Sequence, residues 1–315
     1  MVNEPRLRIH DTQEWYDLYQ PVTNDELQKF FDRYTKGIEN GWESTPKVRV
    51  SLLGYNEVCR ASSSTLLIGI PNMLIQPNIV NHVFPDWPVP STKHLTLYLT
   101  SSGTLSPSPP SSSSSLTYDA AAPSTQEDAD PGELHFTYTF PSRSYLLGSS
   151  LATLFVSTAA TDDLDVFVQL RKADQTGKIL QSYNVPLADL ARMGMSEHEI
   201  PVINPLIYLG PTGHLRASHR ALDPLLSKPH WPIHAHTAEE KIPPGQVTKL
   251  DIGVWPGGMV FSPGEQLVVK VSGHWMTLAE YPHLRGEAKT INKGECELWV
   301  GGERLSCVVL PFVEV

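Results

Sequence analysis

The sequence predicts a mainly β protein built around a β-sandwich. Apolar and polar residues alternate with a period of two in many short segments, such as KVRVSLL at residues 47–53. Glycine and proline, 21 and 27 of the 315 residues, separate these segments, and few stretches between them have the helical period. Short strands with frequent breaks are typical of sandwiches and barrels, and we expect a sandwich.

The N-terminal region predicts a short strand, a polar loop and one helix. The strand is expected at Arg6–Ile9 and runs directly into His10. The helix is expected at Asp25–Lys36, with Thr23 or Asn24 as its N-cap and Gly37 after its last residue. Its apolar residues share one face, which is expected to pack against the sandwich or against the sheet of a hydrolase domain: Leu27, Phe30, Phe31 and Tyr34.

Further strands are expected wherever the alternation returns. These segments are residues 47–53, 95–99, 135–140, 152–156, 165–170, 247–254, 266–271 and 307–312. Two segments interrupt the pattern. Residues 57–77 form an irregular insert that fits neither period, and residues 103–131, with SPSPPSSSSS at 106–115, are too polar to offset their ordering entropy. We expect a low-complexity surface loop at 103–131.

The composition argues against several classes of partner and compartment. With 24 basic and 34 acidic residues, the formal charge of −10 disfavours nucleic acid and anionic membranes as partners. The cysteines Cys59, Cys296 and Cys307 form no C-x-x-C pair, so neither a disulfide framework nor a Cys-rich zinc site is indicated. The N-terminus lacks a signal-peptide pattern, and no apolar run approaches ~20 residues. A cytoplasmic protein is expected, and its oligomeric state is not indicated.

Several motifs together resemble one family. HDTQEWYDLYQP at 10–21 and LQKFFDRYTKGIENGWESTPKVRVSLL at 27–53 resemble the last strand and last helix of an α/β-hydrolase domain that leads into a C-terminal sandwich. LFVSTAATDDLDVFVQLRKAD, YLGPTGHLRASHRALDP, KPHWPIHAHT and PPGQVTKLDIGVWPGGMVFSPGEQLVVKVSGH resemble that sandwich. The family is that of cocaine esterase and X-prolyl dipeptidyl aminopeptidase, the CocE/NonD-type hydrolases.

The resemblance implies a jelly-roll, galactose-binding-like sandwich at residues 47–315, preceded by an α/β-hydrolase remnant at 1–46. It also implies a serine hydrolase acting on a small ester or an X-Pro peptide, without a cofactor. His10 matches the position of the family's catalytic histidine. However, the chain contains no G-x-S-x-G elbow, and only nine residues precede His10. We therefore expect an N-terminally truncated chain, or a fragment of a gene whose start is misplaced, that is inactive alone.

A second hypothesis, from a different functional class, is that the chain is a non-catalytic sandwich. It would bind a carbohydrate, a peptide or a partner, or serve a small-molecule biosynthetic pathway.

A metal site is not favoured by either hypothesis. His234 and His236 would lie on the same side of a strand, but their pattern matches the family's sandwich, for which no metal is implied. Asp162, Asp163 and Asp165 lack the spacing and central glycine of a calcium loop.

The stretch from Gly213 to Val260 is dense in arginine, histidine and tryptophan. The resemblance implies that it is an excursion of the sandwich that packs over a hydrolase domain. The residues expected to wall a pocket or interface there are Arg216, His219, Arg220, Trp231, His234 and Trp255. The glycines that follow Trp255 and Pro256 predict a tight turn or bulge at a strand end.

Overall fold

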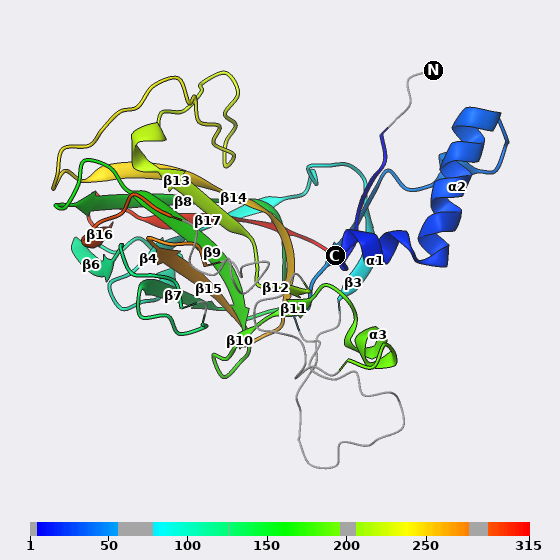
Figure 1. Cartoon of the computed structure of the whole chain (residues 1–315), viewed down its shortest axis with the longest axis horizontal. Coiled ribbons are helices and arrows are strands. Elements are labelled where there is room, and N and C mark those ends of the chain that lie inside the picture. Colours follow the sequence, from blue (N-terminus) through cyan, green and yellow to red (C-terminus); the bar gives the residue numbers. More distant parts are fainter. Residues whose placement is uncertain (1–4, 56–77, 126, 196–205, 277–288) are drawn as a thin grey trace, which may run out of the picture.

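Two large β-sheets face each other in the computed structural model, with a small sheet and two helices at one end (Figure 1). The structure describes residues 5–55, 78–125, 127–195, 206–276 and 289–315. The expected irregular insert at 57–77 lies outside the described residues, as does Cys59. Among the residues described, no helix is both long and apolar enough to cross a membrane.

The helices and strands have the following bounds. The helices are α1 (Glu14–Leu18), α2 (Pro21–Lys36) and α3 (Leu187–Arg192), and single 3-10 turns lie at Trp42–Ser44 and Ala217–His219. The strands are β1 (Leu7–Ile9), β2 (Val48–Leu52), β3 (Ile79–Phe84), β4 (Lys93–Leu99), β5 (Leu105–Ser106), β6 (Ser114–Asp119), β7 (Glu133–Thr139), β8 (Ser144–Thr158), β9 (Asp165–Ala173), β10 (Ile179–Leu180), β11 (Ser182–Tyr183), β12 (Ile207–Tyr208), β13 (Thr212–Arg216), β14 (Thr248–Phe261), β15 (Gln266–Ser272), β16 (Glu295–Val300) and β17 (Cys307–Val313).

The main core lies between the two large sheets. One sheet has the strand order β5-β4-β17-β8-β16-β6, and β14 also pairs with β8; the other has the order β10-β9-β15-β7, and β13 also pairs with β9. Alternate residues of facing strands meet in one buried cluster, which includes Leu154 of β8, Leu250 of β14, Leu170 of β9 and Val269 of β15. The period-two alternation thus produces a sandwich, because each sheet has one apolar face to bury.

The small sheet joins the N-terminal region to the sandwich. Its order is β1-β2-β3, with β1 parallel to β2 and β3 antiparallel to β2. Leu53 continues β2 and exchanges backbone hydrogen bonds of 3.0 Å with Gly258 and Val260 of β14. A second buried cluster, with Val50 and Leu52 on one side and Leu147 on the other, covers this junction. The expected domain boundary between residues 46 and 47 therefore separates β1 from β2, which are paired in one sheet.

The predicted fold class is confirmed, and each expected strand overlaps an observed one. The jelly-roll connectivity stays a prediction. The expectation of a single N-terminal helix is wrong, because α1 precedes α2. The helix α2 also begins earlier than expected, at Pro21 with Gln20 as its N-cap, because proline suits the first helical turn; Gly37 ends it in the left-handed region as predicted.

The expectation of a loop throughout residues 103–131 is wrong at two strands. β5 pairs with β4, and β6 pairs with β16 along its full length. The serines of β6 contribute little apolar surface, but the backbone hydrogen bonds of a ladder do not depend on side-chain type. Tyr118 is buried at 4% exposure and gives β6 one anchor in the core.

Candidate functional site

His10 is the first candidate, and it follows the last residue of β1. Because β1 and β2 run parallel, with Ile9 opposite Val50, their carboxyl ends lie at the same edge of the small sheet. In α/β sheets this edge is where functional residues gather. The His10 side chain is half-buried, and its Nδ1 atom is inaccessible and has no hydrogen-bond partner among the described residues.

The loop that carries His10 is held on both sides. The side-chain amide of Asn78 donates to Asp11 Oδ2 at 2.9 Å, and Asn78 Oδ1 accepts the Gly54 N–H at 2.8 Å. On the other side the Gln13 N–H donates to the Asn184 carbonyl at 2.6 Å. The backbone around His10 is therefore fixed against the small sheet and against the segment after β11.

Arg8, two residues before His10, binds α1 to the small sheet. Its guanidinium donates to both oxygens of Asp17, at 2.7 and 2.8 Å, and this bidentate contact raises the pKa of Arg8 despite partial burial. In the part of the chain that the structure describes, no carboxylate pairs with His10, and no serine or cysteine hydrogen-bonds to it. A histidine without these partners cannot perform acyl transfer.

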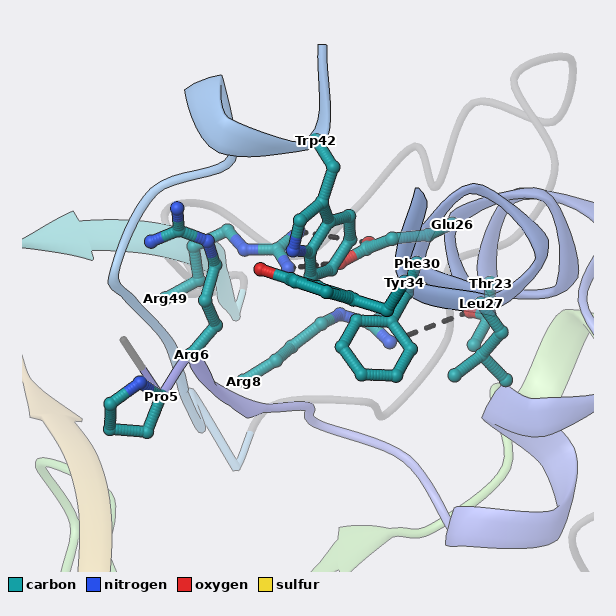
Figure 2. Close-up of a pocket in the computed structure, with 10 residues that line it drawn as sticks. All are labelled: Pro5, Arg6, Arg8, Thr23, Glu26, Leu27, Phe30, Tyr34, Trp42 and Arg49. Carbon is teal, nitrogen blue, oxygen red and sulfur yellow. Dashed lines mark hydrogen bonds and ion pairs between the residues drawn. The ribbon is translucent and has the colours of Figure 1, made fainter. Parts of the chain in front are cut away.

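A cavity of about 500 Å³ lies between α2 and the small sheet (Figure 2). Aromatic rings and guanidinium groups converge on it, as Figure 2 shows for Tyr34, Trp42, Arg8 and Arg49. Phe30 connects the rings, with its centroid 4.9 Å from that of Tyr34 and 5.2 Å from that of Trp42. The other residues lining the cavity are Pro5, Arg6, Thr23, Glu26 and Leu27.

Most of the charge in this cavity is neutralised internally. Arg49 binds both oxygens of Glu26, and this hydrogen bonding lowers the pKa of Glu26 although burial opposes the shift. Arg6 donates only to the Glu43 carbonyl, at 3.0 Å, and forms no ion pair with a described carboxylate. The carboxylate of the lining, Glu26, is thus occupied by Arg49, and the Thr23 hydroxyl accepts from Arg8 at 3.5 Å. The mixture of aromatic rings and guanidinium groups suits this cavity to binding or packing.

Large apolar side chains are exposed on α1, on α2 and just after α2. We call them together the helical apolar face. They are between 38% and 77% exposed: Trp15, Leu18, Tyr19, Val22, Leu27, Phe31, Tyr34 and Ile38. Phe30 packs against Phe31, Tyr34 and Trp42, whereas the expected packing of α2 against a hydrolase sheet stays a prediction. Exposed apolar side chains in this number favour an interaction site.

Arg216, the first expected wall residue, pairs within the sandwich. It ends β13, and its guanidinium donates to both oxygens of Asp165 at 2.8 and 3.0 Å, which raises the pKa of Arg216. Asp163 accepts the Ser218 N–H at 2.9 Å and pairs with Lys241 at 2.9 Å. Two of the three aspartates that were considered for calcium, Asp163 and Asp165, thus anchor the start of the excursion.

His219, Arg220 and His234 also make contacts within the excursion or with β14. His219 Nδ1 and the Ser218 hydroxyl are 3.1 Å apart, and Arg220 donates to the Glu240 carbonyl at 2.6 Å. His234 Nε2 donates to the Asp251 carbonyl at 3.0 Å; burial lowers the pKa of His234, although this hydrogen bond opposes the shift. His234 therefore fastens the excursion to β14, whereas the contacts of His219 and Arg220 hold the excursion together internally.

Trp231 and Trp255 lie at different places on this surface. The Trp231 backbone closes a tight turn with Lys228 through two hydrogen bonds of 3.0 Å. Trp255 is 71% exposed and stands at the predicted bulge, which the register shift between Val254 and Gly257 confirms.

Residues 217–247 lie at the end of the sandwich opposite to α2 (Figure 1), so the structure does not bring the excursion together with His10. Its role as a wall over a hydrolase stays a prediction.

The sequence analysis missed a buried charged cluster at the start of β7. Glu133 and Lys270 form an ion pair of 2.6 Å whose side chains are 2% and 1% exposed, and Asp130 and His274 lie beside it. Glu133 and His135 alternate with Leu134 and Phe136, which pack in the main core, so the two polar residues lie on the other face of β7 and follow the pattern of an ordinary surface. The pairing of distant residues was not readable from one sequence.

Comparison with known proteins places the chain in a family. The X-Pro dipeptidyl-peptidase C-terminal non-catalytic domain matches residues 40–295. A CocE/NonD family hydrolase from Staphylococcus aureus is similar in structure, with a TM-score of 0.78 and 25% identity, over 99% of this chain and 49% of that one. No curated protein matches the sequence.

Two more distant solved structures share the fold. An aminopeptidase from a marine sediment Thaumarchaeota archaeon has a TM-score of 0.55 over 91% of this chain and 44% of its own. An α-amino acid ester hydrolase has a TM-score of 0.53 over 93% and 45%, and both are 16% identical to this chain. The chain therefore spans about half the length of the solved structures that it matches. By its domain match and its structural neighbours, the chain belongs to the CocE and X-Pro dipeptidyl-peptidase family of hydrolases, with a C-terminal non-catalytic domain of that family at its centre.

Proposed function

We propose that this chain is the C-terminal part of a serine hydrolase that cleaves small esters or peptide bonds. In this proposal His10 is the general base, and the serine and the acidic residue of the triad come from a hydrolase segment outside this sequence. The observation that carries the proposal is the position of His10 at the carboxyl end of β1, with a buried Nδ1 that has no partner among the described residues. In a Ser-His-Asp triad this nitrogen donates to the aspartate.

The chemistry assigned to His10 follows from its two ring nitrogens. Nδ1–H would donate to the acidic residue, which leaves Nε2 free to accept the proton of the serine hydroxyl. The serine oxygen then attacks the carbonyl carbon, and Nε2 returns the proton to the departing alcohol or amine. Water attacks the acyl-enzyme by the same route, and the serine is restored.

The helical apolar face supports the need for a second segment. Val22 is 77% exposed and Phe31 is 53% exposed, and both lie on the helix that covers the small sheet. A strand of that segment would also have an edge to pair with, since β1 pairs only with β2 among the described strands. A hydrolase segment that extends the small sheet past β1 would cover both features and fill the cavity beside Arg6.

An activity assay on the chain as it stands tests this proposal. We expect neither labelling by a fluorophosphonate probe nor hydrolysis of p-nitrophenyl acetate above the rate of a His10→Ala variant. Turnover by the isolated chain that disappears in His10→Ala would overturn the requirement for another segment. Saturable binding of a glycan or a peptide by the isolated chain would instead support a non-catalytic sandwich.

A further inference from the structure

The buried cluster at the junction of β7 and β15 contains three potential metal ligands. Asp130 precedes β7, Glu133 is its first residue, and His274 follows β15 by two residues. Glu133 lies opposite Ser272 in the ladder, so the two strand ends meet. Asp130 is 3% exposed and His274 is 5% exposed. One ligand atom from each of the three residues lies within 4.8 Å of the others.

Both carboxylates are held by neighbouring donors. Glu133 Oε2 receives Lys270 Nζ at 2.6 Å and His135 Nε2 at 3.1 Å, which leaves Oε1 directed at His274. Asp130 Oδ2 accepts the Thr125 N–H and hydroxyl at 2.7 and 2.9 Å. Both carboxylates are therefore fixed in position by donors from neighbouring residues.

The orientation of His274 is set by one backbone carbonyl. Its Nδ1 lies 2.9 Å from the Ala122 oxygen, and because a carbonyl can only accept, Nδ1 carries the proton. In the neutral ring Nε2 then presents a lone pair. This atom is buried and forms no hydrogen bond within the described residues. It faces Asp130 Oδ2 at 3.5 Å and Glu133 Oε1 at 3.6 Å.

These separations suit a metal ion better than a hydrogen bond. A charge-assisted N–H···O contact is shorter, about 2.7–2.9 Å. Nitrogen and oxygen ligands at about 2.0–2.2 Å from a tetrahedral zinc ion stand about 3.4 Å apart. The imidazole also disfavours calcium and magnesium, which prefer oxygen ligands, and the Ala122 contact is the second-shell arrangement that orients a metal-binding histidine.

We propose that Asp130 Oδ2, Glu133 Oε1 and His274 Nε2 bind one zinc-like divalent ion in a structural site. The ligand side chains are only 1–7% exposed, so no substrate reaches the ion, and a water molecule completes its coordination. Bound there, the ion fixes the segment between β6 and β7 to the end of β15. This site is independent of the proposed hydrolase chemistry and lies within the sandwich.

The competing arrangement is an imidazolium at His274 paired with the two carboxylates. It needs no metal, and it requires protons on both ring nitrogens. Cobalt(II) distinguishes the two arrangements, because it substitutes for zinc and absorbs visible light when bound in a tetrahedral site.

The test uses the full chain after removal of metal with a chelator. We expect titration with Co²⁺ to give a visible absorption band that saturates near one equivalent and is displaced by Zn²⁺. His274→Leu and Glu133→Gln should each lose the band, with their folding checked by circular dichroism. The matched control is His236→Leu, since His236 is exposed and its ring lies 5.8 Å from that of His219, where adventitious binding would occur.

Two results would overturn the proposal. One is a wild-type chain that binds no Co²⁺ and shows both ring nitrogens of His274 protonated at neutral pH by NMR. The other is a Co²⁺ band that persists in folded His274→Leu and disappears in His236→Leu. Because the NMR measurement needs only the wild-type chain, a failure of either variant to fold leaves the proposal testable.

Discussion

Lys172 and Glu265 form an ion pair that is almost completely buried. Lys172 Nζ lies 2.7 Å from Glu265 Oε2, and the side chains are 0% and 6% exposed. The same ammonium donates to the carbonyls of Gly54 and Val260, each at 2.7 Å. All three of its protons are thus used, and two of them connect β9 with β14 and with the residues that follow β2 of the small sheet. The contact joins the sandwich to the region that carries His10.

Replacing this lysine should destabilise the fold strongly. In Lys172→Met the buried Glu265 carboxylate loses the Lys172 ammonium, and breaking a buried pair in this way costs about 3–5 kcal/mol. Denaturant unfolding of the purified chain measures the loss. Lys178→Met is the matched control, because Lys178 is exposed and its replacement should change stability by less than about 0.5 kcal/mol. Equal stabilities of the two variants would contradict this account of the pair.

The unfolding free energy should depend on pH through Glu133. Its pKa falls from 4.5 to about 2 on folding, a difference of 4.5 − 2 = 2.5 units, or about 3 kcal/mol. Since the folded pKa is the lower one, this contribution is complete above about pH 4.5 and is lost as the pH falls toward 2. With chelator present, the unfolding free energy should fall less steeply between about pH 5 and pH 3 in Glu133→Gln than in the wild type. Parallel slopes would rule out this role.

Gly213 is required by the close approach of β13 to β14. A Cβ at this position would stand 2.4 Å from the Gly253 oxygen and 3.1 Å from the Val254 Cα. Both are backbone atoms, so one strand would have to move. We expect Gly213→Ala to lower the unfolding free energy by about 1–3 kcal/mol, the usual cost of overpacking. Gly245→Ala is not a suitable control because Gly245 has a φ of 80°, whereas Ser142→Ala, at an exposed position, should be neutral.

The helical apolar face should make the isolated chain associate with itself. Val22 and Phe31 present large apolar side chains to solvent, and their replacement removes no contact of the main core. The double variant Val22→Ser and Phe31→Ser should therefore elute at a smaller apparent mass and bind less of the dye ANS. Light scattering after size exclusion measures the mass. An unchanged elution profile and unchanged ANS binding would show that this face does not drive self-association.

Much of the fold could be predicted from local patterns. Alternation located the long strands β8, β9, β14 and β15, because each has one face in the core. It failed for β6, whose serines carry no apolar signal and whose partner β16 follows more than 170 residues later. β13 was missed for a similar reason, since Thr212–Arg216 contains a glycine and three polar residues and is defined by its pairing with β9.

The candidate site was less accessible from sequence. His10 could be singled out because it follows a strand, but the buried Nδ1 depends on how residues 11, 13 and 78 hold the loop. Arg216 could be singled out as a polar residue of the excursion, but its partner, Asp165, lies 51 positions away. Spacing along the chain does not reveal such partners, because the sheet register determines which residues meet.

The most direct test of the central claim joins this chain to its upstream reading frame. The esterase rate of the longer product should fall by about 10⁶-fold in His10→Ala, because a triad without its base retains only the catalysis due to the oxyanion hole and to substrate binding. His82→Ala, in the neighbouring strand β3, should keep full activity. A rate that survives His10→Ala, or an upstream frame closed by a stop codon, would contradict the assignment of His10 as the base of a serine hydrolase.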